Sequence, residues 1–150
     1  MSPRGIFLEN EFLQSAAFLA IRSKHAIRVL LEFYRRRKIH KPKGHRGKHT
    51  NPVIVNNGEI ELRYRDAIKR LNISQATFSR CLTELVELGF LDIAVVSCGL
   101  HRQATKWTIS ERWKAYGTPD FKIVKRVPIK PPFVRKRKTQ LSAMNTKTEE

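Results

Sequence analysis

The stretch from Leu62 to Phe90 constrains the fold of this chain more than any other part of the sequence. From Gln75 to Leu88, apolar residues recur at three- and four-residue spacing, which predicts a helix with one apolar face. Ser74 precedes this run and can accept a first-turn amide, and Gly89 follows it, where a left-handed residue ends a helix. The face expected in the core comprises Phe78, Cys81, Leu82, Leu85 and Val86.

A shorter helical run, from Arg65 to Leu71, precedes this helix, and we expect it to bury Ala67, Ile68 and Leu71. Between the runs the chain reads Leu71-Asn72-Ile73-Ser74, and asparagine is second only to glycine in accepting a left-handed backbone. Two short helices joined by so tight a turn predict a helix-turn-helix. The turn resembles the Leu-Gly-Ile-Ser of helix-turn-helix proteins, with Asn72 in place of the glycine.

The segments on either side of the helix pair predict a small antiparallel sheet. Val53 to Leu62 holds two short apolar runs around Asn57-Gly58, a dipeptide typical of tight hairpins. A second hairpin is expected over about residues 90–109, directly after the longer helix. In that position it would be the wing of a winged helix-turn-helix, although an ordinary hairpin has the same pattern. We therefore predict an α+β fold, mainly α, of the winged helix-turn-helix type.

The rest of the chain is expected to divide into an arm, a domain and a tail. Residues 1–11 lack a clear period and predict an arm, and residues 12–117 form the domain. Residues 118–150 are basic and contain prolines, which predicts a disordered tail. Within the domain, residues 110–116 predict a final helical turn that docks Trp113 on the core.

Two serines predict where the first helices of the domain begin. Ser15 is expected to cap a brief helix through Ile21, and Ser23 a longer one from Lys24 to about Arg37. A single continuous helix across Arg22 and Ser23 is the alternative. One face of the longer helix is apolar, and it either packs behind the helix pair or joins two copies in a homodimer. That face comprises Ala26, Ile27, Leu30, Leu31 and Tyr34.

The charge of the chain predicts its class of partner. There are 30 Lys and Arg against 13 Asp and Glu, a formal net charge of +17, and the basic residues are segregated from the acidic ones. Such a charge predicts a polyanionic partner and argues against an adaptor that binds only proteins. We expect double-stranded DNA, with RNA as the alternative. Exposed aromatic rings on a sheet would favour RNA, because single strands are bound largely by stacking, and Trp107 leaves that alternative open.

A basic loop is expected over residues 35–52. Residues 35–49 hold eight Lys or Arg and three His with no acid, and Pro42, Gly44 and Gly47 oppose regular structure. Cations here, such as Arg46 and Lys48, would bind phosphates without selecting a sequence. The histidines lack cysteine partners and the paired spacing of a zinc site, so no metal is expected.

The expected DNA contacts fall on four segments. We expect the helix over about residues 75–88 to enter the major groove as the recognition helix. On it, Gln75 could bind adenine, Arg80 guanine or a phosphate, and Ser79 and Thr83 a phosphate or a thymine methyl. The full set comprises Arg63, Arg65, Gln75, Ala76, Thr77, Ser79, Arg80 and Thr83 on the helix pair, His101, Arg102 and Lys106 on the wing, Arg46 and Lys48 in the basic loop, and Arg135, Lys136, Arg137 and Lys138 in the tail.

No feature of the sequence indicates an enzyme or a cofactor. The carboxylates are scattered, whereas a nuclease would gather them around Mg²⁺. There is no glycine-rich phosphate loop and no nucleophile elbow, and Tyr64 and Tyr116 lack the partners of a strand-transferring tyrosine. The sequence has no apolar run long enough for a membrane span and no secretory signal, so we expect a cytoplasmic protein.

Two stretches resemble a known group of proteins. LVELGFLDI, from residue 85, and WTISERWKAYGTPDF, from residue 107, are similar to winged helix-turn-helix proteins of plasmids, phages and other mobile elements. The resemblance covers about residues 12–121. It implies a regulator of transcription or an initiator of DNA replication that binds duplex DNA.

Overall fold

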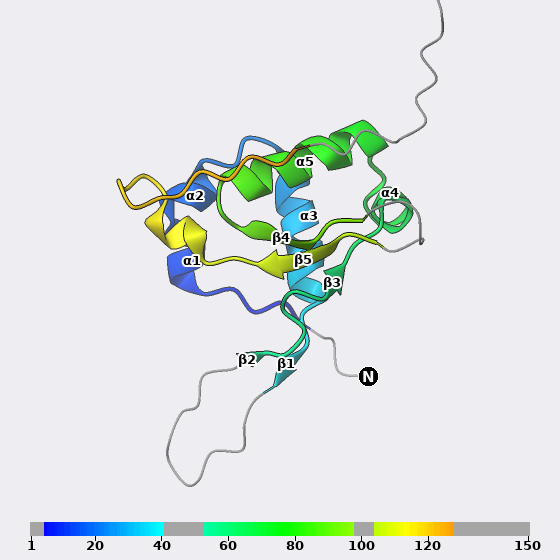
Figure 1. The fold of residues 1–150 in the computed structure, drawn as a ribbon, viewed down its shortest axis with the longest axis horizontal. Coiled ribbons are helices and arrows are strands. Elements are labelled where there is room, and N and C mark those ends of the chain that lie inside the picture. The colour runs from blue at the N-terminus through cyan, green and yellow to red at the C-terminus, as the bar shows by residue number, and fades with distance from the viewer. Residues whose placement is uncertain (1–4, 41–52, 98–103, 128–150) are drawn as a thin grey trace, which may run out of the picture.

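The structure is a computed structural model that describes residues 5–40, 53–97 and 104–127 (Figure 1). These residues form a mixed α and β fold with two small antiparallel sheets, in agreement with the predicted α+β class. The helices are α1 (Asn10–Gln14), α2 (Ala16–Leu19), α3 (Lys24–Arg35), α4 (Tyr64–Leu71), α5 (Gln75–Glu87) and the short 3-10 helix η1 (Arg112–Ala115). The strands are β1 (Ile39–His40), β2 (Val53–Ile54), β3 (Ile60–Glu61), β4 (Leu91–Val95) and β5 (Lys106–Ile109).

The larger sheet has three strands in the order β3-β5-β4. β4 and β5 form an antiparallel hairpin in which Leu91 lies opposite Ile109. The two strands of the hairpin predicted over residues 90–109 are therefore confirmed, and its turn, residues 98–103, lies outside the described residues. β3 pairs with the other edge of β5, so the strand that leads into α4 belongs to the same sheet as the hairpin.

The hairpin predicted over residues 53–62 is wrong. β2 pairs with β1 in a separate two-stranded sheet, whereas β3 joins the larger sheet. The side chains of the turn explain the difference, because each binds a strand outside the predicted hairpin. Asn56 accepts the backbone amide of Lys38 at 2.7 Å, and Asn57 accepts that of Ile109 at 2.7 Å. The Asn-Gly segment therefore carries the chain from one sheet to the other.

The core lies between α3, α5 and the larger sheet, and α3 passes behind the sheet in Figure 1. The ring of Phe33 on α3 meets Trp107 on β5 edge-on, with centroids 5.7 Å apart. All five residues of the predicted apolar face of α5 are buried. On α3 the buried face is turned toward Val29 and Phe33, and Ile27, Leu31 and Tyr34 are only half-buried. The buried face is rotated in this way because α3 packs against the sheet as well as against α5.

α4 buries Ala67 and Leu71 as predicted, but the prediction for Ile68 is wrong. Ile68 is 37% exposed. One step along a helix turns a side chain by about 100°, so a helix that buries Ala67 and Leu71 four residues apart directs Ile68 off that stripe.

The predicted starts of α2, α3 and α5 are confirmed, whereas α2 ends at Leu19 rather than Ile21 and α3 at Arg35 rather than about Arg37. Ser15, Ser23 and Ser74 each accept a backbone amide of the first turn of α2, α3 and α5. Asn72 follows α4 with a φ of 51°, and Gly89 follows α5 with a φ of 86°, both in the left-handed region. These local signals set the lengths of the helices and the sharp turn between α4 and α5.

η1 closes the opposite end of the core from α4 (Figure 1). Trp113 is buried, as predicted, and its ring stacks on that of Phe90, with centroids 6.3 Å apart and an interplanar angle of 20°. The ring of Phe12 on α1 meets Trp113 edge-on at 5.1 Å. The aromatic contact therefore joins α1, η1 and the residue just before β4.

Within the described ranges, no helix has the length and apolar character needed to cross a bilayer. The same residues hold no cluster of three or more His, Cys, Asp and Glu placed to bind a metal ion. Cys81 is a free thiol in the core, and burial raises its pKa, which disfavours the reactive thiolate.

Candidate nucleic-acid interface

The turn between α4 and α5 fixes the position of the predicted recognition helix. Ser74 Oγ accepts the amide of Thr77 at 3.1 Å, so the first turn of α5 begins at the predicted residue. The ring of Tyr64 on α4 meets Phe78 on α5 edge-on, with centroids 5.0 Å apart. The apolar flank of α5 is therefore held against α4 and the core, and its polar flank faces outward.

Three of the predicted contact residues are exposed on the first two turns of α5. Gln75, Ala76 and Arg80 are open to solvent, and no hydrogen bond or ion pair engages the side chain of Gln75 or Arg80 among the described residues. Thr77 is half-buried, and its hydroxyl lies 2.9 Å from Ser74 Oγ. This flank offers an amide, a small side chain and a guanidinium.

Two further predicted contacts, Ser79 and Thr83, are already occupied. Arg126 Nη1 donates to the backbone oxygen of Ser79 at 3.0 Å, to its hydroxyl at 3.1 Å and to Thr83 Oγ1 at 3.4 Å. Its Nη2 donates to the hydroxyl of Tyr64 at 2.9 Å. Arg126 therefore joins α4 to the polar flank of α5.

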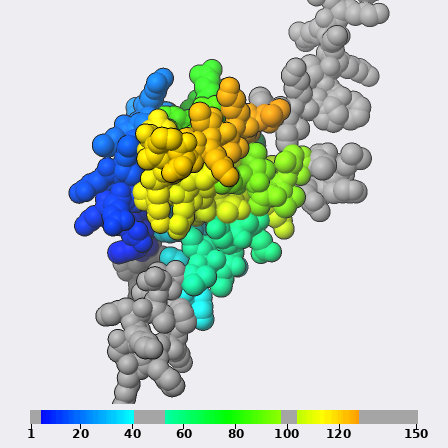
Figure 2. Space-filling view, turned by 60° about the vertical axis from the view of Figure 1, so that its left-hand side comes forward, coloured from blue at the N-terminus to red at the C-terminus, as the bar shows by residue number. Residues whose placement is uncertain are grey.

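Arg126 belongs to the segment that the sequence assigned to a disordered tail. Through residue 127 this segment instead lies along the outside of α5, as the orange trace in Figure 1 and the orange atoms in Figure 2 show. Residues 121–127 read FKIVKRV, in which apolar and basic residues are interleaved, and this was the signal for an extended segment lying on a surface. Where it would lie depends on tertiary structure, so sequence reasoning missed Arg126.

The other predicted contacts are distributed unevenly. Arg63 and Arg65 are exposed at the start of α4, and Arg63 Nη2 lies 3.7 Å from a carboxylate oxygen of Glu61. Lys106 on β5 is half-buried and opposite Glu61 in the sheet. Eight of the predicted contact residues lie outside the described residues: Arg46, Lys48, His101, Arg102, Arg135, Lys136, Arg137 and Lys138.

β1 precedes residues 41–52 and β2 follows them. The two-stranded sheet that they form lies at the opposite end of the molecule from α5. In Figure 1, β1 and β2 project from the bottom of the body, and α5 runs along its top. The basic loop predicted over residues 35–52 is wrong at Ile39–His40, which form β1 and pair with β2. Both strands start from a different part of the surface than the recognition helix, and residues 41–52 lie outside the described residues.

Carboxylates near α5 have structural partners. Glu84 Oε1 accepts the backbone amides of Arg22 at 2.6 Å and Ser23 at 3.4 Å. Asp92 is bound by Arg112, whose Nε lies 3.0 Å from Oδ1. Glu87 is exposed at the last turn of α5, away from Gln75. The first two turns of the helix are thus the less acidic part of this face.

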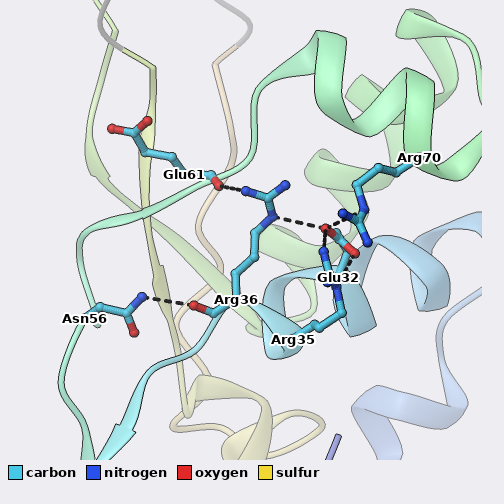
Figure 3. Close-up of polar contacts among 6 residues, drawn as sticks. All are labelled: Glu32, Arg35, Arg36, Asn56, Glu61 and Arg70. Carbon is cyan, nitrogen blue, oxygen red and sulfur yellow. Dashed lines mark hydrogen bonds and ion pairs between the residues drawn. The ribbon is translucent and has the colours of Figure 1, made fainter. Parts of the chain in front are cut away.

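A buried carboxylate fixes α3 against α4. Glu32 is 6% exposed, accepts hydrogen bonds from Arg35 at 2.8 Å and Arg36 at 3.1 Å, and forms an ion pair with Arg70 of α4 at 3.3 Å (Figure 3). Arg36 also donates to the backbone oxygen of Glu61 at 3.0 Å. Burial raises the pKa of Glu32, but the hydrogen bonds from Arg35 and Arg36 outweigh it, and the net pKa is lowered. The cluster holds the two helices in register behind the interface.

Comparisons of the chain with protein-family models, curated proteins and solved structures give no significant match. The geometry and charge of the surface formed by α4, α5 and the segment beside them are therefore what indicates a function.

Proposed function

We propose that this protein binds double-stranded DNA as a winged helix-turn-helix, with the first two turns of α5 in the major groove. One observation carries the proposal: Gln75, Ala76 and Arg80 are exposed on the second helix of a tight helix pair in a strongly basic chain. The side chains of Gln75 and Arg80 form no hydrogen bond with the described residues. The neighbouring hydroxyls do, on Ser74, Thr77, Ser79 and Thr83.

The chemistry of this flank suits base edges. A glutamine amide can bind both N6 and N7 of adenine, and an arginine can bind both O6 and N7 of guanine. Ala76 lies between them in sequence and adds little bulk, which allows the helix backbone to approach the floor of the groove. An α-helix with its side chains is about 10–12 Å wide, close to the roughly 12 Å width of the major groove.

Neighbouring elements supply cations for the DNA backbone. Arg63 and Arg65 are exposed where α4 begins, close to the Tyr64 ring that contacts α5. The β4–β5 hairpin follows α5 and corresponds to the wing, with Lys106 at the start of its second strand. Cations in these positions would set the orientation of the protein, and the base contacts would select the sequence.

The aromatic residues favour duplex DNA over RNA. Trp107, the residue that left stacking on the sheet open, is 2% exposed, and Phe78 and Phe90 are fully buried. Single-stranded RNA is bound largely by stacking bases on exposed rings. The described face of the three-stranded sheet does not offer Trp107 for that purpose.

The decisive experiment compares a random duplex, a single-stranded DNA and a structured RNA of equal length across a series of salt concentrations. We expect the duplex to bind most tightly, with log K falling by about 0.9 per phosphate contact for each unit of log salt. Preference for structured RNA would replace the proposal with the RNA-binding alternative, and no binding to any of the three would overturn both.

We further propose that binding serves regulation of transcription or initiation of replication on a mobile element in the cytoplasm, as the sequence resemblance implies. Selection of tight binders from random duplexes would define the target site. A sedimentation measurement would then show whether the protein is a homodimer, and a dimer predicts a palindromic site with half-sites about one helical turn apart.

A further inference from the structure

We propose that residues 118–127 form a latch that covers one flank of α5 and leaves it when DNA binds. The inference rests on the proposed function and adds a regulatory step to it. The latch is defined by two attachment points, one at the C-terminal end of α5 and one at its middle.

The first attachment point is Arg112 of η1, which contacts the C-terminal end of α5. Its Nη2 donates to the backbone oxygen of Val86 at 2.9 Å, and its Nη1 donates to that of Lys122 at 2.9 Å. The same guanidinium is held by Asp92. The ring of Phe121 meets Tyr116 edge-on at 5.2 Å, which adds an apolar contact before the segment reaches α5.

The second attachment point is Arg126, which contacts Ser79, Thr83 and Tyr64. From Val86 back to Ser79 the helix rises about 10 Å, and from Lys122 to Arg126 an extended chain covers about 13 Å. The segment therefore runs antiparallel to α5 in a nearly extended form, along the flank that includes Ser79 and Thr83.

The segment could either enter the major groove together with α5 or leave before α5 enters, and the width of the groove decides between these two roles. The helix alone is about 10–12 Å wide and fills a groove of roughly 12 Å. An extended chain alongside it adds about 5 Å, if spaced like a neighbouring strand. The helix and the segment together are wider than the groove, so α5 cannot enter deeply until the segment leaves.

In its observed position the segment exposes Lys122 and Lys125 but keeps its third cation, Arg126, from phosphates. Ile123 is 71% exposed and Val127 is 79% exposed, and neither can bind an anion. The guanidinium of Arg126 is directed at acceptors on α4 and α5. When the latch is released, Ser79 and Thr83 become available and Arg126 can reach the DNA backbone.

A latch of this kind lowers the apparent affinity without changing the contacts in the complex. If the open state is about one tenth populated, the apparent Kd is about tenfold weaker than that of an open protein. A change that breaks the latch should therefore tighten DNA binding, even if it removes a positive charge.

The test compares Arg126→Ala with Lys125→Ala. Each removes one cation from adjacent positions, but Lys125 is exposed and forms no hydrogen bond with the described residues. We expect Arg126→Ala to bind a selected duplex up to roughly tenfold more tightly than the wild type, and Lys125→Ala to bind no more tightly than the wild type. Tyr64→Phe removes one acceptor of Arg126 without changing charge, and it should tighten binding by a smaller factor.

Amide spectra of the labelled protein provide an independent readout. Addition of the duplex to the wild type should move the resonances of residues 121–125 away from their free positions, in the direction in which Arg126→Ala moves them. Arg126→Ala binding as weakly as Lys125→Ala, or resonances of the segment that stay in place in the complex, would overturn the latch while leaving DNA binding intact. Failure of every variant and of the wild type to bind would overturn the proposed function and the latch with it.

Discussion

The backbone amide of Trp113 donates to the carbonyl oxygen of Gly89 over 3.1 Å, which brings η1 directly against the end of α5. A Cβ atom on Gly89 would lie 2.8 Å from the backbone nitrogen of Trp113. The glycine thus has two functions: its positive φ ends the helix, and its missing side chain makes room for the chain that carries the aromatic contact with Phe90.

Gly89→Ala should therefore lower the free energy of unfolding by about 2–5 kcal/mol, combining about 1–2 for a left-handed alanine with about 1–3 for the displaced backbone. Gly117→Ala is the matched control, because Gly117 has a φ of 84° and no atom within 4 Å of the added carbon. Gly117→Ala should lower the free energy of unfolding by only about 1–2 kcal/mol, the cost of a left-handed alanine. Urea unfolding of both variants measures the difference, and equal losses would show that the close approach of η1 carries no energy.

Glu32→Gln should lower the free energy of unfolding at pH 7 by about 1–3 kcal/mol, the scale of hydrogen bonds to a charged group. The arginines around it are partly exposed, at 28–48% for their side chains, so water compensates for part of the loss. Glu59→Gln, on an exposed residue, is the control and should leave stability within about 0.5 kcal/mol.

The same carboxylate predicts a pH dependence. The pKa of Glu32 is lower in the folded protein than its usual 4.5, so its contribution is complete above that value and is lost as the pH falls through the lower, folded pKa. Wild-type stability should therefore decrease from about pH 4.5 downward more steeply than that of Glu32→Gln. Parallel decreases in chemical denaturation at several pH values would contradict the lowered pKa.

Arg80→Ala should weaken binding to a selected duplex by about 1–3 kcal/mol and relax the preference at one base pair, if Arg80 contacts guanine. Arg80→Lys keeps the charge but not the two-point contact. It should lose the preference as well while keeping the salt dependence. Weakening that is uniform across sequences, together with full recovery by lysine, would assign Arg80 to a phosphate.

Ser74→Ala and Ser74→Asp separate the cap of α5 from its surface. The alanine variant loses the acceptor of the Thr77 amide and should cost about 1 kcal/mol of stability. Aspartate is an equally good cap, so Ser74→Asp should remain as stable as the wild type. Its charge near the groove should weaken DNA binding at least about fivefold, since a charge about 4 Å from a phosphate costs about 1 kcal/mol even in water. Unchanged DNA binding by this variant would show that the start of α5 is not at the interface.

The predictable parts of this fold are those set by neighbours in sequence. Ser74, Asn72 and Gly89 act within one turn of where they stand, so the bounds of α4 and α5 followed from the sequence. The partner of β2 did not, because β1 is separated from β2 by residues 41–52 and Asn57 binds Ile109, 52 residues away. A local dipeptide predicts a turn but does not determine which strands meet on either side of it.

The candidate interface was predictable to the same extent. Gln75, Ala76 and Arg80 are exposed because the apolar stripe of α5 leaves them outside the core. The same periodicity places Ser79 and Thr83 outside the core. They are nevertheless covered by Arg126, which lies 47 and 43 residues further along the chain. Helical periodicity identifies the side of a helix that avoids the core, and it contains no information on a segment that returns to cover that side.

Glu84 accepts hydrogen bonds from the backbone amides of Arg22 and Ser23, and this has a consequence for where the chain can be truncated. The chain that enters α3 depends on an acceptor that is synthesised 61 residues later, in the middle of α5. A fragment that stops before residue 84 would leave those amides to water and would lack the helix on which α3 packs. We therefore regard the helices as a single cooperative unit, in which unfolding of α5 also exposes the beginning of α3.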